Sequence, residues 1–218
     1  MSGAATHSRP VPVSADHRAA FHAAFPVSRE TESRLNRYES LLREWNQSLS
    51  LVADSTLESL WTRHFLDSAQ LLPLISDPEK PVIDLGTGAG FPGVILAIMG
   101  LSRIHLIEHN MRKVAFLRTL IGELGLDVTL HAMKVESVKP FAAGVVTARA
   151  FKPLTELIGV GRKFLGPDGV AIFPKGRKAE EELSLAAQDW RLRVERFKSL
   201  TDAESTIFRL SDIAEAHR

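Results

Sequence analysis

Four closely spaced glycines have the pattern of a cofactor-binding loop. They stand between an apolar run that is predicted to be a strand and an aliphatic run that is predicted to be a helix, at Gly86, Gly88, Gly90 and Gly93. Because glycine has no Cβ, such a turn lets a ligand come close to the backbone. The last three glycines fit the G-x-G-x-x-G pattern of dinucleotide-binding loops, in which a helix N-terminus meets a pyrophosphate. The segment therefore predicts a cofactor site at this turn.

An acid just before the glycines favours a different cofactor. Counted from Asp84, the segment has the acid-x-G-x-G-x-G form of methyltransferases that use S-adenosylmethionine. A carboxylate at this strand end can order the loop and attract the cationic amino group of a methionine moiety, whereas it would repel a pyrophosphate. Pro92 removes one amide donor from the helix start, which matters more for a doubly charged anion than for a zwitterion. The methyl donor is favoured, and the dinucleotide is the alternative.

Other residue types narrow the chemistry further. Tyr38 is the only tyrosine and lies outside any Tyr-x-x-x-Lys unit, so the catalytic tyrosine of short-chain dehydrogenases is absent. Glu108 closes the second predicted strand, where an acid is expected to bind the ribose hydroxyls of either cofactor. The chain has no cysteine, which excludes disulfides, thiolate zinc sites and cysteine nucleophiles. The histidines show no metal-ligand spacing, so no metal is predicted.

The elements that position these residues follow an α/β pattern. Short apolar strands alternate with helical stretches, which is typical of a mostly parallel sheet covered on both faces. The strands are predicted at 81–85, 103–108, 127–133, 144–149 and 169–173. The clearest helix begins at the capping residue Asn110 and ends at Gly125. A final antiparallel pair is predicted at 190–194 and 206–210.

The N-terminal part precedes this pattern. Residues 1–26 lack periodicity and are predicted to be a flexible arm, with a short helical turn near Phe21. Residues 27–218 are predicted to form a single domain, of which 27–76 is an N-terminal helical extension. It holds two amphipathic helices, and the second is predicted to begin with the capping-box sequence at Ser55.

Charge is distributed unevenly along a chain of 218 residues with a net charge of only +1. Residues 139–178 hold eight basic and two acidic side chains, a local +6, so the rest sums to −5. This asymmetry indicates an acidic partner on one side, and a scattered solvated surface is the alternative. The longest aliphatic run, Val94–Met99, is far below the ~20 residues of a membrane span. We therefore expect a cytoplasmic protein, and a monomer because no long apolar stripe is evident.

Short motifs in a fixed order give a more specific identification. The chain resembles the bacterial 16S ribosomal RNA guanine-N7 methyltransferase family, also called glucose-inhibited division protein B, from about residue 28 to 177. The motifs are Arg63-His64-Phe65-Leu66-Asp67-Ser68, the segment 84–93, Glu108 with Arg112-Lys113 and Phe116-Leu117-Arg118, Val135-Glu136, Arg149-Ala150-Phe151 with Pro153-Leu154, and Lys175-Gly176.

The resemblance implies a class I S-adenosylmethionine-dependent methyltransferase fold, with a Rossmann-like sheet and an N-terminal helical extension. It implies methyl transfer to N7 of a single guanosine in 16S rRNA of the small ribosomal subunit or its precursor. The cofactor contacts that it implies are Asp84, Gly86, Gly88, Phe91, Glu108, Val135, Glu136 and Arg149. Val135 and Glu136 would flank the adenine.

Arg149 is the first choice for a catalytic residue, because open α/β sheets bind ligands beyond their carboxyl strand ends. Its partner is left open between the methionine carboxylate, guanine O6 and a phosphate, and a surface arginine that caps the next helix is the alternative. The residues predicted to contact RNA are Arg63, His64, Lys134, Lys175 and Arg177. For His64 a hydrogen-bonded histidine between helices is favoured over catalysis, and Arg63 can pair with Asp67 across one helical turn. For Lys175 and Arg177, solvated loop charge is the alternative to phosphate contact.

The predicted reaction needs little acid or base chemistry. Guanine N7 has an in-plane lone pair and no proton to lose, so the protein must chiefly align N7, the methyl carbon and the sulfonium. Such alignment lowers the activation free energy by on the order of 7 to 11 kcal/mol in favourable cases. Two other functions stay open, namely methylation of another RNA or a small molecule, and nucleotide binding without catalysis.

Overall fold

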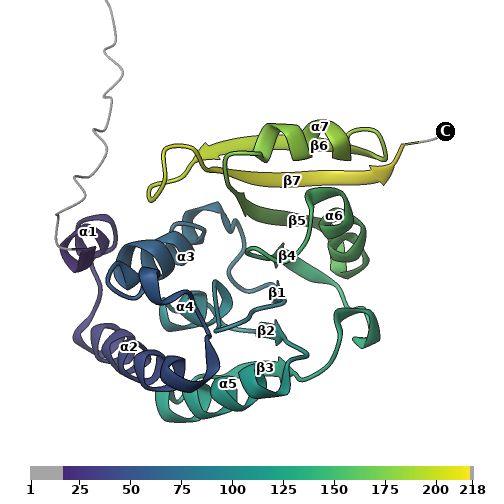
Figure 1. The fold of residues 1–218 in the computed structure, drawn as a ribbon. Coiled ribbons are helices and arrows are strands. Elements are labelled where there is room, and N and C mark those ends of the chain that lie inside the picture. The colour runs from purple at the N-terminus through teal and green to yellow at the C-terminus, as the bar shows by residue number, and fades with distance from the viewer. Residues whose placement is uncertain (1–16, 217–218) are drawn as a thin grey trace, which may run out of the picture.

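The computed structural model describes residues 17–216, which form a seven-stranded sheet with helices on both faces (Figure 1). The sheet order is β3-β2-β1-β4-β5-β7-β6. The strands are β1 Val82–Leu85, β2 Ile104–Ile107, β3 Val128–His131, β4 Ala143–Thr147, β5 Leu165–Lys175, β6 Trp190–Lys198 and β7 Thr206–Glu215. The first five are parallel, and β7 runs antiparallel to both β5 and β6. The predicted parallel sheet and final antiparallel pair are confirmed.

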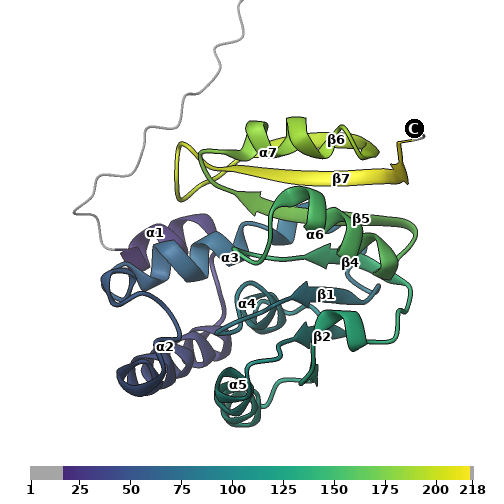
Figure 2. The same cartoon turned by 45° about the vertical axis from the view of Figure 1, so that its right-hand side comes forward.

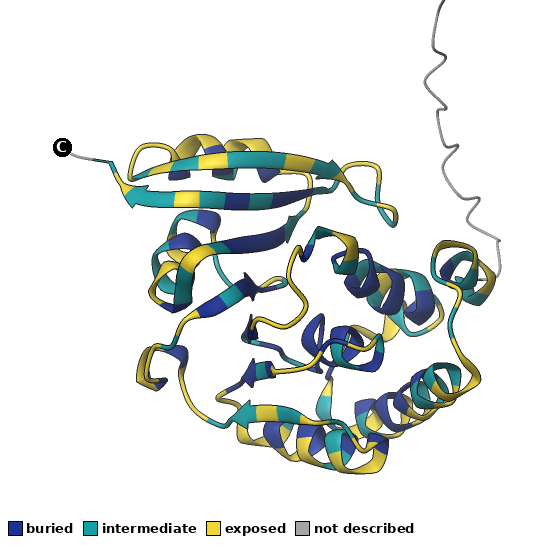
Figure 3. Ribbon diagram, turned by 180° about the vertical axis from the view of Figure 1, so that it is seen from behind, coloured by how far each residue is buried: buried dark blue, intermediate teal, exposed yellow. Residues whose placement is uncertain are grey.

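Alternation of apolar side chains along the strands builds a core on each face of the sheet. In β1, Val82 belongs to one buried cluster while Ile83 and Leu85 belong to the other. Figure 2 shows the layers, and Figure 3 shows buried positions along the central strands and exposed ones on the outer helix faces. The helices are α1 His17–Ala24, α2 Arg29–Leu49, α3 Asp67–Ala69, α4 Gly93–Ile98, α5 Met111–Leu124, α6 Leu154–Gly161 and α7 Ala179–Ala186. None of the described helices is long and apolar enough to cross a membrane.

The N-terminal segment differs from the prediction of a flexible arm. His17–Ala24 forms helix α1, and Phe21 is fully buried, with its ring centroid 5.3 Å from that of Trp61. The guanidinium of Arg18 lies 4.0 Å from the centroid of the same Trp61 ring. An aromatic anchor and a cation over its partner stabilise this short helix, so residues 17–24 are not a flexible arm, and the predicted helical turn near Phe21 is confirmed. The rest of the predicted arm, residues 1–16, lies outside the described residues.

The start of the second helix is also corrected. The capping box predicted at Ser55 does not form, because Asp54–Thr56 closes a short 3₁₀ turn and the helix begins only at about residue 60. Asn46 fixes this connection: its Nδ2 donates to Asp54 Oδ1 (2.7 Å) and its Oδ1 accepts from the Val52 amide (2.9 Å). Residues Trp61–Leu66 then wind as a π-helix that leads into α3. Such wide turns are frequent at functional sites.

Candidate active site

The glycine loop lies at the carboxyl end of β1, where the backbone of three glycines enters the left-handed region. The φ angles are +65° at Gly86, +62° at Gly88 and +104° at Gly90. A Cβ at Gly86 would lie 2.3 Å from the ring of Phe151, whereas a Cβ at Gly88 would meet nothing nearer than 3.9 Å. The hydroxyl of Tyr38 supports the loop from α2 by donating to the Ala89 carbonyl (2.6 Å). The loop is therefore held in place by α2 and leaves open space at Gly88, and we call residues 86–90 the glycine cradle.

Asp84 organises the loop from beneath. Its side chain is fully buried, and Oδ2 accepts hydrogen bonds from Thr87 Oγ1 (2.5 Å) and the Gly93 amide (2.9 Å). The other oxygen, Oδ1, has no hydrogen-bond partner among the described residues. A buried carboxylate bonded to the loop places negative charge beside it, which fits the predicted attraction for a cationic amino group.

The protonation of Asp84 gives a testable pH dependence of stability. Burial raises the pKa of Asp84 from 3.8 to about 6, although the bonds from Thr87 and Gly93 act in the opposite direction. The folded state holds this proton more tightly than the unfolded chain, so the carboxylate destabilises the fold as pH rises from about 4 through about 6. We expect the unfolding free energy of the wild type, relative to Asp84→Asn, to fall by about 2 kcal/mol between pH 4 and pH 7.5, which is most of the ~3 kcal/mol of the complete titration. Urea unfolding at pH 4 and pH 7.5 measures it, and a difference that is independent of pH would contradict the account.

Glu108 ties the loop to the start of α5. Its Oε1 accepts from the amides of His109 (2.8 Å) and Asn110 (2.7 Å), and its Oε2 accepts from the Gly88 amide (3.1 Å). The predicted ribose acid is therefore beside the glycine cradle. Lys113, which the sequence interpretation did not assign to the site, lines the pocket next to Gly88. Its signal was its place in the motif that follows Glu108.

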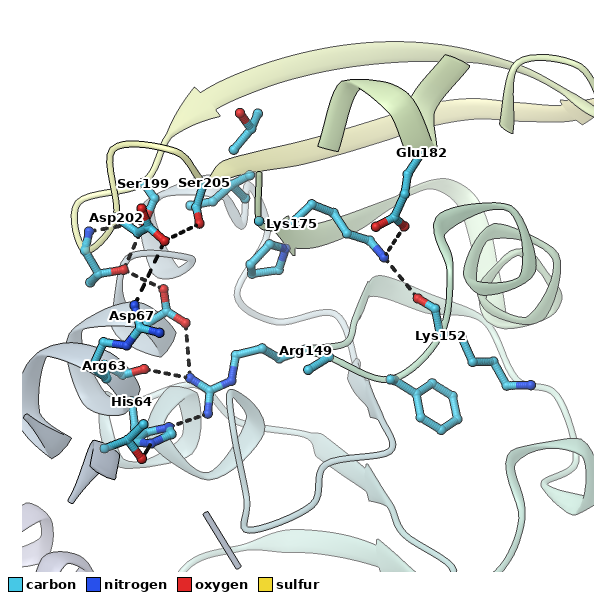
Figure 4. Close-up of a pocket in the computed structure, with 18 of the residues that line it drawn as sticks. Arg63, His64, Asp67, Arg149, Lys152, Lys175, Glu182, Ser199, Asp202 and Ser205 are labelled. Carbon is cyan, nitrogen blue, oxygen red and sulfur yellow. Dashed lines mark hydrogen bonds and ion pairs between the residues drawn. The ribbon is translucent and has the colours of Figure 1, made fainter. Parts of the chain in front are cut away.

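Two pockets meet at the carboxyl edge of the sheet. The smaller, about 280 Å³, lies between the glycine loop and the segment 51–56, and its wall includes Gly86, Gly88 and Phe91. The larger, about 860 Å³, is lined by residues of α3, of the ends of β4 and β5, and of the β6–β7 loop (Figure 4). The walls of both pockets include Thr56, His64, Arg149 and Ala150. A donor in the smaller pocket and an acceptor in the larger one would meet at these side chains.

Arg149 lies at this junction and is held from several sides, as Figure 4 shows. Its Nη1 donates to the Arg63 carbonyl and to Asp67 Oδ2 (both 3.1 Å), and its Nη2 lies 2.7 Å from His64 Nδ1. Its guanidinium carbon is 4.8 Å from the centroid of Phe91. The side chain is only 17% exposed, so the alternative of a surface arginine that caps the next helix is wrong. Asp67 pairs with Arg149, and the predicted Arg63–Asp67 pair does not form.

His64 is a neutral acceptor in this arrangement. Burial, Arg149 and Arg63 together lower the pKa of His64 from 6.5 to about 3. The hydroxyl of Thr56 donates to the Ala53 carbonyl (2.7 Å), so His64 Nε2–H donates to Thr56 (2.8 Å) and leaves Nδ1 to accept from Arg149. The ring stacks on Phe91 at a centroid distance of 4.9 Å. This confirms the favoured interpretation of His64 as a hydrogen-bonded histidine.

The remaining predicted cofactor residues lie apart from this junction. Val135 is buried in the core on one face of the sheet, and Glu136 is exposed on the same short turn, 4.0 Å from the Lys152 ammonium. Neither residue is among those that line the two pockets. Lys134 precedes them and is exposed. Asp84 and Glu108 do not line the pockets either, but both bond to the backbone of the glycine loop. The structure therefore brings these two acids together with the loop, Phe91 and Arg149, and it leaves the turn at 134–136 apart.

Two of the predicted RNA contacts, Arg63 and Arg177, are exposed, whereas Lys175 is largely buried. Arg63 has a side chain that is 52% exposed and lies at the wall of the larger pocket. Lys175 is only 10% exposed, and its ammonium donates to Glu182 Oε2 (2.8 Å) and to the Lys152 carbonyl (3.0 Å). Lys175 therefore links β5 to α7, and the alternative of a solvated loop charge is wrong. It also lines the larger pocket, and its contact with a phosphate stays a prediction. Arg177 is 80% exposed and pairs with Glu204. Within residues 17–216, no group of three or more acidic or histidine side chains could hold a metal.

Comparisons with known proteins agree with this geometry. The chain is 49% identical to the ribosomal RNA small subunit methyltransferase G of Rhodospirillum centenum, over 89% of this chain and 90% of that protein. It is 43% identical to the protein of the same name from Rhodospirillum rubrum, over 90% and 98% of the two chains.

Solved structures show the fold. TYW2 of P. horikoshii in complex with MeSAdo has a TM-score of 0.54 at 13% identity, over 67% of this chain and 61% of that one. The glycopeptide N-methyltransferase MtfA complexed with S-adenosyl-L-homocysteine has a TM-score of 0.55 at 11% identity. This match covers 67% of this chain and 88% of that one. These likenesses confirm the predicted methyltransferase fold. A family profile described as rRNA small subunit methyltransferase G matches residues 31–207. The match covers most of the chain, and the resemblance seen in its motifs is confirmed: this protein belongs to the rRNA small subunit methyltransferase G family.

Proposed function

We propose that this protein transfers a methyl group from S-adenosylmethionine to N7 of a single guanosine in 16S rRNA. The observation that carries the proposal is the pair of pockets that share Arg149 and His64. One pocket contains the glycine cradle, and the other is roomy enough for a base that is turned out of an RNA chain. Family membership supports small-subunit rRNA as the substrate.

The smaller pocket and the two carboxylates that bond to its glycine loop suit S-adenosylmethionine, which supplies an electrophilic methyl group on a sulfonium. Glu108 lies where its carboxylate can accept from ribose hydroxyls, beside the open position at Gly88. Asp84 places negative charge beneath the loop, which suits a cationic amino group better than a pyrophosphate. Phe91 offers an aromatic face on which Arg149 and His64 already lie. Arg149 then stands between donor and acceptor.

The larger pocket suits an acceptor atom that has no proton to lose. His64 is neutral, and both of its ring nitrogens are engaged. Asp67 is held by Arg149, Thr201 and Gln70. Neither is placed as a general base, and guanine N7 needs none. The donors of Arg149 can bind guanine O6 beside N7, which would orient the base for in-line transfer.

Chemical cleavage of rRNA tests the proposal. A strain from which this gene is deleted should lose one 7-methylguanosine from its 16S rRNA, seen as a lost primer-extension stop after borohydride and aniline treatment. A plasmid copy of the gene should restore the stop. If the deletion strain keeps every N7-methyl stop, the assignment is wrong.

Arg63 is expected to contribute to RNA binding. Replacing it by glutamine should raise KM for 30S particles several-fold and leave kcat nearly unchanged, because an exposed cation at the pocket wall contacts phosphate and not the reacting atoms. The slope of log KM against log salt should shrink by about 1. Lys163→Gln is the matched control, since Lys163 is exposed but precedes β5 at the opposite edge of the sheet. Equal salt slopes for Arg63→Gln and the wild type would argue against an RNA contact.

We further infer a monomer that acts in the cytoplasm on the small subunit or its precursor without a metal. The proposed methyl transfer uses no ligand besides S-adenosylmethionine and RNA. Sedimentation of the purified protein tests the monomer, which is expected at the chain mass of 24.0 kDa.

A further inference from the structure

We infer that the tip of the β6–β7 hairpin is part of the active site, in which Thr201 is a positioning residue that acts through Asp67 on Arg149. The inference rests on the proposed function, because it assigns a role in the same reaction. Thr201 lies in the loop between β6 and β7, far along the chain from both Asp67 and Arg149. The loop forms one wall of the larger pocket (Figure 4).

A directed series of hydrogen bonds joins the hairpin tip to Asp67. The hydroxyl of Thr201 lies 2.7 Å from Asp67 Oδ1 and donates to it, because an ionised carboxylate can only accept. Ser199 Oγ lies 3.0 Å from Thr201 Oγ1 and must therefore be the donor of that pair. Gln70 Nε2 donates to both Asp67 Oδ1 (2.9 Å) and Ser199 Oγ (3.3 Å). The Leu200 amide donates to Gln70 Oε1 (2.7 Å), which anchors the loop backbone.

Asp67 passes this constraint to Arg149. With Oδ1 taken by Thr201 and Gln70, the carboxylate turns Oδ2 toward Arg149 Nη1 (3.1 Å). Asp67 and Arg149 are 18% and 17% exposed, so their bond lies largely out of water, where such bonds are stronger. Fixing the carboxylate therefore fixes the guanidinium plane on Phe91.

The other end of the series lies in the wall of the cofactor pocket. Arg149 donates to the Arg63 carbonyl and to His64, and His64 donates to Thr56. Together with the bond to Asp67, the two bonds that Arg149 donates here use three of its five N–H groups among the described residues, which leaves Nε–H and one Nη2 hydrogen for a ligand. The hairpin tip thereby sets the direction in which Arg149 presents its remaining donors.

Isosteric replacement of Thr201 tests the inference. Thr201→Val keeps the shape but removes the hydroxyl, so we expect kcat for methylation of 30S particles to fall about tenfold through misplacement of Arg149. KM for 30S particles, affinity for S-adenosylhomocysteine and the melting temperature should change little. Thr201→Ser should restore kcat. Thr129→Val, at an exposed position of β3, is the matched control and should behave as the wild type.

A double-mutant cycle separates this role from a general loop effect. Asp67→Asn replaces one of the two acceptor oxygens by an NH2 donor, so the side chain can no longer accept from Thr201 through one oxygen and from Arg149 through the other. Adding Thr201→Val should therefore cause no further loss of kcat. An undiminished kcat in Thr201→Val, or an additive loss in the double variant, would overturn the inference.

The ¹⁵N signals of the Arg149 guanidinium test the role of Thr201 without methyl transfer, and therefore independently of the proposed function. In the ¹⁵N spectrum of arginine-labelled protein, the Arg149 guanidinium signals, assigned through Arg149→Lys, should broaden in Thr201→Val and sharpen again in Thr201→Ser. Identical Arg149 signals in wild type and Thr201→Val would overturn the inference. Absence of 7-methylguanosine in the wild-type reaction would instead overturn the proposed function.

Discussion

Arg149→Lys is expected to reduce kcat for methylation of 30S particles about 100-fold. Lysine keeps one charge, but it cannot reach the Arg63 carbonyl, Asp67 and His64 in the directions of the planar guanidinium, and it has no planar group to place over Phe91. Loss of one oriented donor in an active site costs a factor of this order. Transfer of a tritiated methyl group to 30S particles measures the effect under single-turnover conditions.

Arg162→Lys provides the control for this prediction. Arg162 also lies over an aromatic ring, that of Trp190, and pairs with Glu215, but it is remote from both pockets. Its variant should methylate 30S particles at the wild-type rate. Retention of more than half of the wild-type rate in Arg149→Lys would show that the junction of the two pockets is not the site of transfer.

Gly86→Ala is expected to weaken binding of S-adenosylhomocysteine about tenfold or more. A left-handed backbone costs a residue with a Cβ roughly 1–2 kcal/mol, and 1.4 kcal/mol corresponds to a factor of ten in affinity. The new methyl group would also lie 2.3 Å from Phe151, so either the loop or that ring must move. Both lie beside the cofactor pocket. Isothermal titration calorimetry measures the change.

Gly122→Ala is the matched glycine control. Gly122 lies in α5 with open space around its Cβ position, so alanine should leave binding unchanged and stabilise the helix by roughly 0.5–1 kcal/mol. Wild-type affinity in Gly86→Ala would mean that the cofactor does not use this turn.

Most of the fold can be predicted from local sequence patterns. Each parallel strand is a short apolar run next to a turn signal, and the capping residue Asn110 and the left-handed Gly125 bound α5 as predicted. The loop at 84–93 can be predicted from sequence because its conformation itself requires glycines in the left-handed region and an acid that accepts from the loop, all at fixed spacing. The motifs around Arg63–Ser68 and Arg149 by themselves indicate residues of the site.

Contacts between distant segments could not be predicted in the same way. The pairing of Lys175 with Glu182 depends on where α7 packs, which no pattern near Lys175 encodes. Helix α1 depends on insertion of Phe21 against Trp61, 40 positions away. The link from Thr201 to Asp67 spans 134 positions and arises only because the final hairpin joins the sheet beside β5. The corrections therefore fall where tertiary packing overrides a local signal.

The most direct measurement is a reaction of the purified protein with S-adenosylmethionine and 30S particles from the deletion strain, followed by mass mapping of the 16S rRNA. The account predicts one added methyl group per 16S rRNA molecule, on a single guanosine, recovered as 7-methylguanosine after digestion. A methyl group on an exocyclic amine, a ribose or another base, or none on RNA while S-adenosylmethionine binds, would contradict it.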